Sequence, residues 1–190
     1  MAGVSEETKV SSIAVADEED YDTLYPDKLR MGIPPEKKDV ISREKRFVQV
    51  CANLFLSSAD AAEDERNITR EKITHVVHLA GRIINYSASL RETGIKQEAF
   101  VIHDDDIDCT PTLIRISLWI QSALKEEKSR VLVHCVMGSS RSPTVVAAYL
   151  VHSGVIPSGD DAFKCVMKAA PWIIPSGYFQ TLVRRLEKQV

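Results

Sequence analysis

The sequence predicts an α/β fold around a mostly parallel sheet, because short β-branched runs alternate with longer amphipathic stretches. Residues 74–80 and 131–134 are typical of buried strands, and residues 99–102 form a third predicted strand. A helix follows this third strand, with Thr110 as the N-cap and Pro111 in the first turn. Strands that alternate with helices are typical of sheets covered by helices.

The remaining elements flank these strands. Residues 47–50 and 54–56 are predicted strands joined by a turn, and residues 59–72 are predicted to be mostly helical. Helices are expected over residues 141–152, 160–169 and 177–189, with Ser176 as the cap of the last one.

Residues 1–45 differ in composition from the rest of the chain. An acidic block precedes a block rich in Lys, Arg, Pro and Glu, and apolar periodicity is poor throughout. We therefore expect an N-terminal tail over residues 1–45, flexible or partly docked, that either solvates the chain or binds a protein partner. The folded domain is predicted over residues 46–190.

Composition excludes several classes of function. The chain has 190 residues, of which 44% are hydrophobic, enough for one domain with a core. Its net charge of -3 argues against nucleic-acid binding through phosphate neutralisation. No apolar run approaches the roughly 20 residues of a membrane span, and no secretory signal is visible, so we expect a cytoplasmic protein with the nucleus as a second compartment.

The cysteines and histidines argue against a metal site. None of the four cysteines forms a C-x-x-C pair, and the five histidines are dispersed. The sequence therefore predicts no metal and no cofactor.

The segment over residues 131–143 carries the chemistry, because it is a predicted strand, a loop of small residues and a helix start. Such a loop turns successive N–H groups inward and adds the positive end of a helix dipole, which makes an anion site. Gly138 permits backbone conformations that other residues avoid. The predicted phosphate-binding residues are Val136, Met137, Gly138, Ser139, Ser140 and Arg141.

Cys135 at the mouth of this loop is the candidate nucleophile. Inward N–H groups and a cationic side chain favour a thiolate over a thiol. The Arg141 guanidinium, six residues later, would bind two phosphate oxygens at once. Attack of Cys135 on phosphorus would give a covalent cysteinyl-phosphate intermediate.

The spacing of these two residues alone is weak evidence, since Cys109 and Arg115 also match C-x5-R. That second match has no glycine and begins a predicted helix, so we do not expect it to wrap a phosphate. Context, rather than spacing, identifies the Cys135 loop.

Other residues are candidates for supporting roles. A carboxylic acid must protonate the leaving group, and the residues alone leave Asp104, Asp105, Asp106 and Asp108 open. Ser142 is expected to donate to the Cys135 Sγ atom, with a plain first-turn serine as the alternative. His134 either supports the thiolate or is simply buried.

The pattern His134-Cys135-x-x-Gly138-x-x-Arg141-Ser142 resembles the signature of the dual-specificity phosphatases within the cysteine-dependent protein-tyrosine-phosphatase superfamily. Three further stretches resemble family landmarks: Leu54-Phe55-Leu56-Ser57-Ser58, Ile73-Thr74-His75-Val76-Val77 and Pro175-x-Gly177-Tyr178-Phe179. The chain is similar to the small atypical members, which lack an upstream docking domain.

This resemblance implies a central mixed, mostly parallel sheet of about five strands flanked by helices. It implies metal-independent hydrolysis of phosphotyrosine, and often of phosphoserine or phosphothreonine. It also selects Asp104, 31 residues before Cys135, as the general acid, with Asp105 as the alternative.

One departure from the family pattern bears on the site. The family usually has Asn where this chain has His78, next to the phosphate loop. We therefore expect His78 to support the loop and to make its stability depend on pH. A regulatory disulfide between Cys109 and Cys135 is a further hypothesis.

The leading hypothesis is a phosphoprotein phosphatase, with a phosphoprotein, such as a kinase, as its partner. The alternatives are a phosphatase of a phosphoinositide, glycan or RNA end, and a phosphate-binding pseudophosphatase. A rhodanese-like or arsenate-reductase-like protein also uses C-x5-R, but the helix start at Ser142-Pro143 suits it less well.

Overall fold

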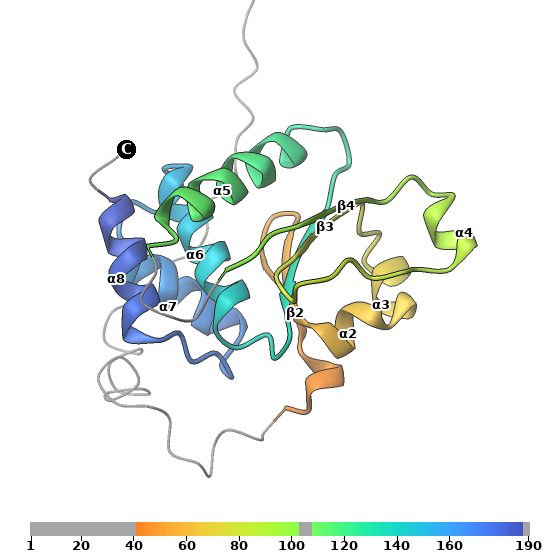
Figure 1. Cartoon of the computed structure of the whole chain (residues 1–190), viewed down its shortest axis with the longest axis horizontal. Helices are drawn as coiled ribbons and strands as arrows, with labels where there is room; N and C mark the ends of the chain where they lie inside the picture. The colour runs from red at the N-terminus through yellow and green to blue at the C-terminus, as the bar shows by residue number, and fades with distance from the viewer. Residues whose placement is uncertain (1–40, 103–107, 188–190) are drawn as a thin grey trace, which may run out of the picture.

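A five-stranded sheet forms the centre of the computed structural model, which describes residues 41–102 and 108–187 (Figure 1). The strands lie in the order β1 (Phe47–Cys51), β2 (Leu54–Ser58), β5 (Val131–Cys135), β3 (His75–His78) and β4 (Lys96–Ala99). β1 pairs antiparallel with β2, and every other pair is parallel. The sheet is therefore mixed and mostly parallel, as the sequence and the family resemblance predicted.

The central strands are apolar because both of their faces are covered. Every residue of β2 and β5 is buried, as expected for parallel strands between two layers of helices. The turn between β1 and β2 places Asn53 at φ 61, a left-handed conformation that asparagine tolerates.

Helices cover both faces of the sheet (Figure 1). One face carries α5 (Thr110–Leu124), α6 (Arg141–His152), α7 (Gly159–Ala169) and α8 (Gly177–Leu186). The other side carries the short helices α2 (Ala59–Glu63), α3 (Glu65–Arg70) and α4 (Ala88–Arg91). A 3-10 turn, η2 (Arg43–Lys45), precedes β1.

Alternate residues of the strands divide between two hydrophobic cores. Leu56, Val77 and Val133 belong to the larger core under α5–α8. Phe55, Val76 and Leu132 belong to the smaller core on the opposite face. This alternation is the period-two pattern of strands.

The sequence misplaced two local features, and a stretch correctly expected to be mostly helical is divided in two. Residues 99–102 were expected to be a strand, but the strand is β4 (Lys96–Ala99), an edge strand with mostly exposed side chains and therefore no apolar signal. Cys109, not Thr110, is the N-cap residue of α5, and Thr110 is already helical. The expected helix over residues 59–72 is two helices, because the side chain of Asp64 caps the second one.

Other predicted elements are confirmed. α6 and α7 match their predicted spans within one residue, and the Ser176 side chain accepts a hydrogen bond from Phe179 N at the start of α8. α8 ends at Leu186 rather than at the predicted residue 189, which lies outside the described part of the chain. The carboxyl ends of β2, β3, β4 and β5 meet at one edge of the sheet, where α/β proteins place their sites.

Candidate active site

Cys135 is the last residue of β5, and only 2% of it is exposed. Its Sγ atom accepts hydrogen bonds from Gly138 N at 3.2 Å and from Ser142 Oγ at 3.2 Å. The predicted contact between Ser142 and the candidate nucleophile is therefore present.

The carbonyl groups of the loop after Cys135 turn away from its centre, because four of them accept from other segments of the chain and that of Ser140 accepts from Thr144 in the first turn of α6. The donors and acceptors are Ala59 N to Val136 O at 3.1 Å, Arg46 Nη1 to Met137 O at 3.0 Å, Trp172 Nε1 to Gly138 O at 3.0 Å, Ile174 N to Ser139 O at 2.7 Å, and Thr144 N to Ser140 O at 3.0 Å. Because a peptide N–H points opposite to its C=O, outward carbonyls direct N–H groups inward. The loop thus has the character of an anion nest.

Gly138 is required at its position for two independent reasons. Its φ of +65 lies in the left-handed region that side chains disfavour. A Cβ atom built there would lie 2.7 Å from Ser58 N and 2.8 Å from the carbonyl carbon of Ser57. The loop therefore closes directly over the end of β2.

Arg141 is the first residue of α6, and its side chain is anchored from the neighbouring strand. Its Nη1 donates to Leu79 O at 3.0 Å, immediately after β3. Leu79 N in turn donates to His134 O at 2.9 Å. These bonds link the candidate cation to the strand that carries the candidate nucleophile.

A buried chain of polar side chains lies beneath the loop. His134 Nε2 is 2.7 Å from His78 Nδ1, and His78 Nε2 is 2.9 Å from Gln97 Oε1. Both imidazoles are fully buried. We call these three residues the imidazole chain.

Both histidines of the imidazole chain are neutral at physiological pH. Burial lowers the pKa of His78 to about 4, although the hydrogen bond that its ring donates to Gln97 Oε1 acts in the opposite direction. Burial also lowers the pKa of His134 to about 3, and His78 acts in the same direction. The two imidazoles therefore form a hydrogen-bonded neutral pair.

The candidate general acids are only partly described. Asp104, Asp105 and Asp106 lie outside the described residues. Asp108 is described, and its Oδ1 accepts from Thr110 N at 3.0 Å. Hydrogen bonds from Thr110 lower the pKa of Asp108, which is opposite to what a proton donor requires.

The second C-x5-R match does not form a loop. Cys109 is the N-cap residue of α5, and the Arg115 guanidinium lies 5.0 Å from the centre of the Phe100 ring. None of the four cysteines, all of which lie in the described part of the chain, forms a disulfide. Burial raises the pKa of Cys51 to about 12, as expected for an inert core cysteine.

Sequence reasoning missed Arg46 and Trp172, whose side chains hold loop carbonyls. Both come from segments distant in sequence, so no local pattern marks them. Arg46 is only 6% exposed, which is unusual for an arginine but is visible only in the folded chain.

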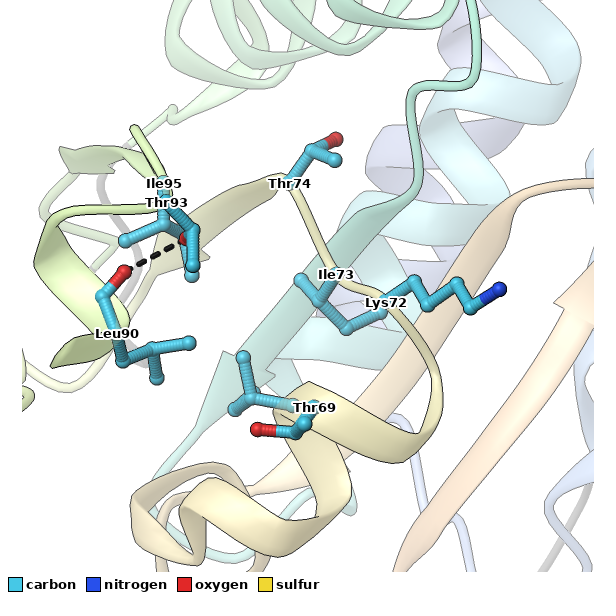
Figure 2. Close-up of a pocket in the computed structure, with 8 residues that line it drawn as sticks. Thr69, Lys72, Ile73, Thr74, Leu90, Thr93 and Ile95 are labelled. Carbon is cyan, nitrogen blue, oxygen red and sulfur yellow. Dashed lines mark hydrogen bonds between the residues drawn. The ribbon is translucent and has the colours of Figure 1, made fainter.

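A separate pocket of about 270 Å³ lies at the opposite edge of the sheet, where β3 and β4 begin. Its lining includes Ile68, Ile73, Leu90 and Ile95. Figure 2 shows the Lys72 side chain running away from Leu90 and Thr93. The hydroxyl of Thr93 donates to Leu90 O at 2.6 Å within this pocket.

Within residues 41–102 and 108–187, no group of three or more His, Cys, Asp or Glu residues is placed to hold a metal ion. The same residues contain no helix long and apolar enough to cross a bilayer.

The fold and the loop define a class, the cysteine-dependent phosphatases. The family model described as "Dual specificity phosphatase, catalytic domain" matches residues 54–189. The chain therefore belongs to the dual-specificity phosphatase family, as its signature predicted.

Named relatives agree with this assignment. The chain is 38% identical to dual specificity protein phosphatase 13B of Mus musculus over 107 residues. This aligned stretch covers 54% of this chain and 54% of the relative. The chain is 29% identical over 149 residues to dual specificity protein phosphatase 2 of Mus musculus, covering 75% of this chain and 43% of the relative. The chain thus spans about half the length of the curated relatives it matches.

A solved structure extends the likeness over nearly a whole domain. The crystal structure of human DUSP28 matches with a TM-score of 0.67 and 26% identity, and covers 79% of this chain and 96% of that one.

Proposed function

We propose that this protein hydrolyses phosphotyrosine in proteins, with phosphoserine and phosphothreonine as further substrates, through a cysteinyl-phosphate intermediate. The observation that carries the proposal is the set of outward carbonyls in the loop over residues 136–140, which directs N–H groups toward a space above Cys135. Such a nest, next to an arginine and a nucleophile, suits the three equatorial oxygens of a phosphoryl group.

The first step transfers the phosphoryl group to sulfur. The Cys135 thiolate attacks phosphorus as Arg141 and the loop N–H groups bind the nonbridging oxygens. An S–P bond forms, the P–O bond to the substrate breaks, and the leaving oxygen takes a proton. We assign that proton to Asp104, with Asp105 as the alternative, on the family resemblance.

The second step releases phosphate. Water attacks phosphorus, the same carboxyl group accepts its proton, and the S–P bond breaks to regenerate the thiolate. The Ser142 hydroxyl, 3.2 Å from Sγ, donates to the departing sulfur. This contact supports a role for Ser142 in breakdown of the intermediate.

The proposal of a protein substrate rests on the uncharged interior and the apolar rim of the loop over residues 136–140. Its interior residues carry no charge, and Val136 and Met137 are 39% and 43% exposed at its rim. An apolar rim suits a peptide that carries an aromatic phosphoester. A phosphoinositide or glycan phosphatase, or a phosphate-binding pseudophosphatase, remains the alternative function.

We also propose residues 46–190 as the catalytic domain and residues 1–45 as a tail that binds a protein partner. The Arg46 contact to Met137 O supports placing this arginine within the domain. A kinase as partner and a cytoplasmic or nuclear location stay predictions.

A substrate comparison tests the proposal. Phosphate release from a phosphotyrosine peptide, a phosphothreonine peptide and a short-chain phosphoinositide would be measured with the full chain, and Cys135→Ser would serve as the control. We expect the tyrosine peptide to be the best substrate. Faster release from the phosphoinositide would move the assignment to the alternative substrate class.

A further inference from the structure

The imidazole chain crosses three adjacent parallel strands. Gln97 lies on β4, His78 on β3 and His134 on β5, and His78 is the direct register partner of His134. On β3 and β5 the apolar residues Val76 and Leu132 occupy the preceding positions of the same face. The smaller core therefore ends in a hydrogen-bonded imidazole pair just where the strands reach the phosphate loop.

Each histidine directly precedes a residue that either carries a proposed reacting group or anchors one. His134 precedes Cys135, the candidate nucleophile. His78 precedes Leu79, whose carbonyl accepts from the Arg141 side chain at 3.0 Å. The 2.7 Å bond between the two rings thus joins the backbone that carries the nucleophile to the backbone that anchors the cation.

We propose that Gln97 and His78 are positioning residues, which hold His134 and thereby fix β5 against β3 so that Cys135 and Arg141 keep their working separation. The inference rests on the proposed phosphatase function and deepens it. A misplacement of reacting groups by about 1 Å can lower the rate by about 100-fold. Loss of the hydrogen bond between His78 and His134 is therefore expected to lower turnover.

The bond between the two imidazoles requires an unprotonated Nδ1 on His78, because Gln97 Oε1 can only accept and so holds the proton of His78 on Nε2. A bond between two ring nitrogens needs one that carries a proton and one that does not. Burial and His78 keep the pKa of His134 low, the backbone of Cys135 opposes this shift, and Arg82 adds to it. Arg82 is paired with Glu63 at 2.7 Å, and Gln97 is the uncharged neighbour on β4.

Three variants of the full chain separate positioning from packing. His78→Leu removes the hydrogen bonds and keeps an apolar side chain. His78→Asn places an amide atom where Nδ1 lies, and it is the residue usual in the family. His75→Leu, on the same strand but at the far end from the loop, is the matched control, since His75 is also buried and bonds to Thr74.

Two readouts would be combined with the thermal midpoint of each variant. The first is kcat and KM with p-nitrophenyl phosphate between pH 5 and pH 8. The second is the rate of Cys135 alkylation by iodoacetamide against pH, followed by mass mapping of the Cys135 peptide, which requires no turnover.

For His78→Leu we expect kcat/KM to fall at least about tenfold and the alkylation profile to move to higher pH. His78→Asn should stay within about threefold of the wild type, and His75→Leu within about twofold. A folded His78→Leu that matches the wild type in both readouts would overturn the inference, as would an Asn variant no better than the Leu variant.

Gln97→Leu keeps the inference testable if His78→Leu does not fold, because Gln97 lies half-buried on an edge strand. For Gln97→Leu we expect kcat/KM to fall about threefold and the alkylation profile to move in the same direction. An unchanged Gln97→Leu would then contradict the inference. Wild-type protein without turnover, but with an alkylation profile that shifts in the variants, would defeat the proposed function and leave the positioning role standing.

Discussion

At the scale of single residues, the loop is determined by what its backbone must do. Gly138 is the point at which the chain passes over Ser57 and Ser58, and its left-handed φ directs its N–H toward sulfur. Ser142 supplies the side-chain donor to the same sulfur atom from the first turn of α6. The nucleophile is thus held by one backbone and one side-chain donor, and each can be removed separately.

Gly138→Ala should distort the loop and lower kcat/KM by about 100-fold. The added Cβ would lie 2.7 Å from a backbone atom, which no rotamer change relieves. Steady-state kinetics with p-nitrophenyl phosphate would measure the loss. Gly154→Ala, also at positive φ but with no atom within 4 Å of its Cβ, is the matched control for backbone strain alone. Equal activity in both variants would contradict the close approach.

Ser142→Ala should slow hydrolysis of the intermediate more than its formation, because the lost hydroxyl acts on the departing sulfur. We expect a burst of p-nitrophenol followed by a steady rate about tenfold lower. Ser153→Ala, which removes a hydroxyl that donates to Leu150 O at the C-cap of α6, is the control. A loss of kcat/KM without a burst would instead place Ser142 in the first step.

The residues proposed to perform the chemistry could be predicted from the sequence, and so could supporting roles for His134 and His78, but the side chains that hold the loop carbonyls could not. Cys135, Gly138 and Arg141 stand in one local motif, so strand, loop and helix patterns were enough to identify them. The donors from Arg46 and Trp172 come from segments that only the folded chain brings to the loop. The bond between His78 and His134 depends on strand register, which periodicity does not determine.

At the scale of elements, the loop is held by its neighbours rather than by its own sequence. The 3-10 turn η2 and Arg46 lie on one side, where Arg43 pairs with Asp60 at 3.1 Å and Arg46 bonds to Met137 O. The connection between α7 and α8 lies on the other side, through Trp172 and Ile174. These two connections restrain the loop before any phosphate arrives.

Trp172→Phe should raise KM for phosphate esters about threefold and leave the thermal midpoint nearly unchanged, because it removes one hydrogen bond and keeps the ring. The comparison variant is Trp119→Phe, in which the ring packs on His75 away from the loop. Inhibition by inorganic phosphate would be measured alongside. Equal KM values and equal phosphate inhibition constants for the two variants would show that the Gly138 carbonyl does not need the hydrogen bond from Trp172.

The sheet illustrates where element prediction fails. β5 and β2 are buried on both faces and were visible as apolar runs. β4 is an edge strand of the sequence Lys-Gln-Glu-Ala, with one ladder of backbone bonds and little apolar contact, so its residues carry no strand signal. The strand was predicted over residues 99–102 instead, because the buried residues Phe100 and Ile102 just after β4 are apolar.

At the scale of the whole molecule, the buried histidines link stability to pH. The folded pKa of His78 is about 4, below the ordinary value of 6.5, so the unfolded chain binds more protons between these two values. Stability is therefore complete above about pH 6.5 and decreases as the pH falls toward 4, with a slope of up to about 1.4 kcal/mol per pH unit for each group. His134, with a folded pKa of about 3, extends the loss to lower pH.

Urea unfolding at pH 7.5, 6.0 and 5.0 would measure this dependence. His78→Asn removes one titrating group and should give a flatter profile than the wild type, whereas a profile as steep as that of the wild type would show that His78 does not titrate in this range. His152→Asn, at the end of α6 and away from the imidazole chain, is the control.

The central claim is that Cys135 is the nucleophile of a metal-independent phosphatase, and hydrolysis of p-nitrophenyl phosphate in EDTA tests it most directly. Wild type and Cys135→Ser would be compared between pH 5 and pH 8. The account predicts turnover by the wild type and none by the variant, which still binds phosphate. Turnover retained by Cys135→Ser, or none in folded and reduced wild type, would contradict it.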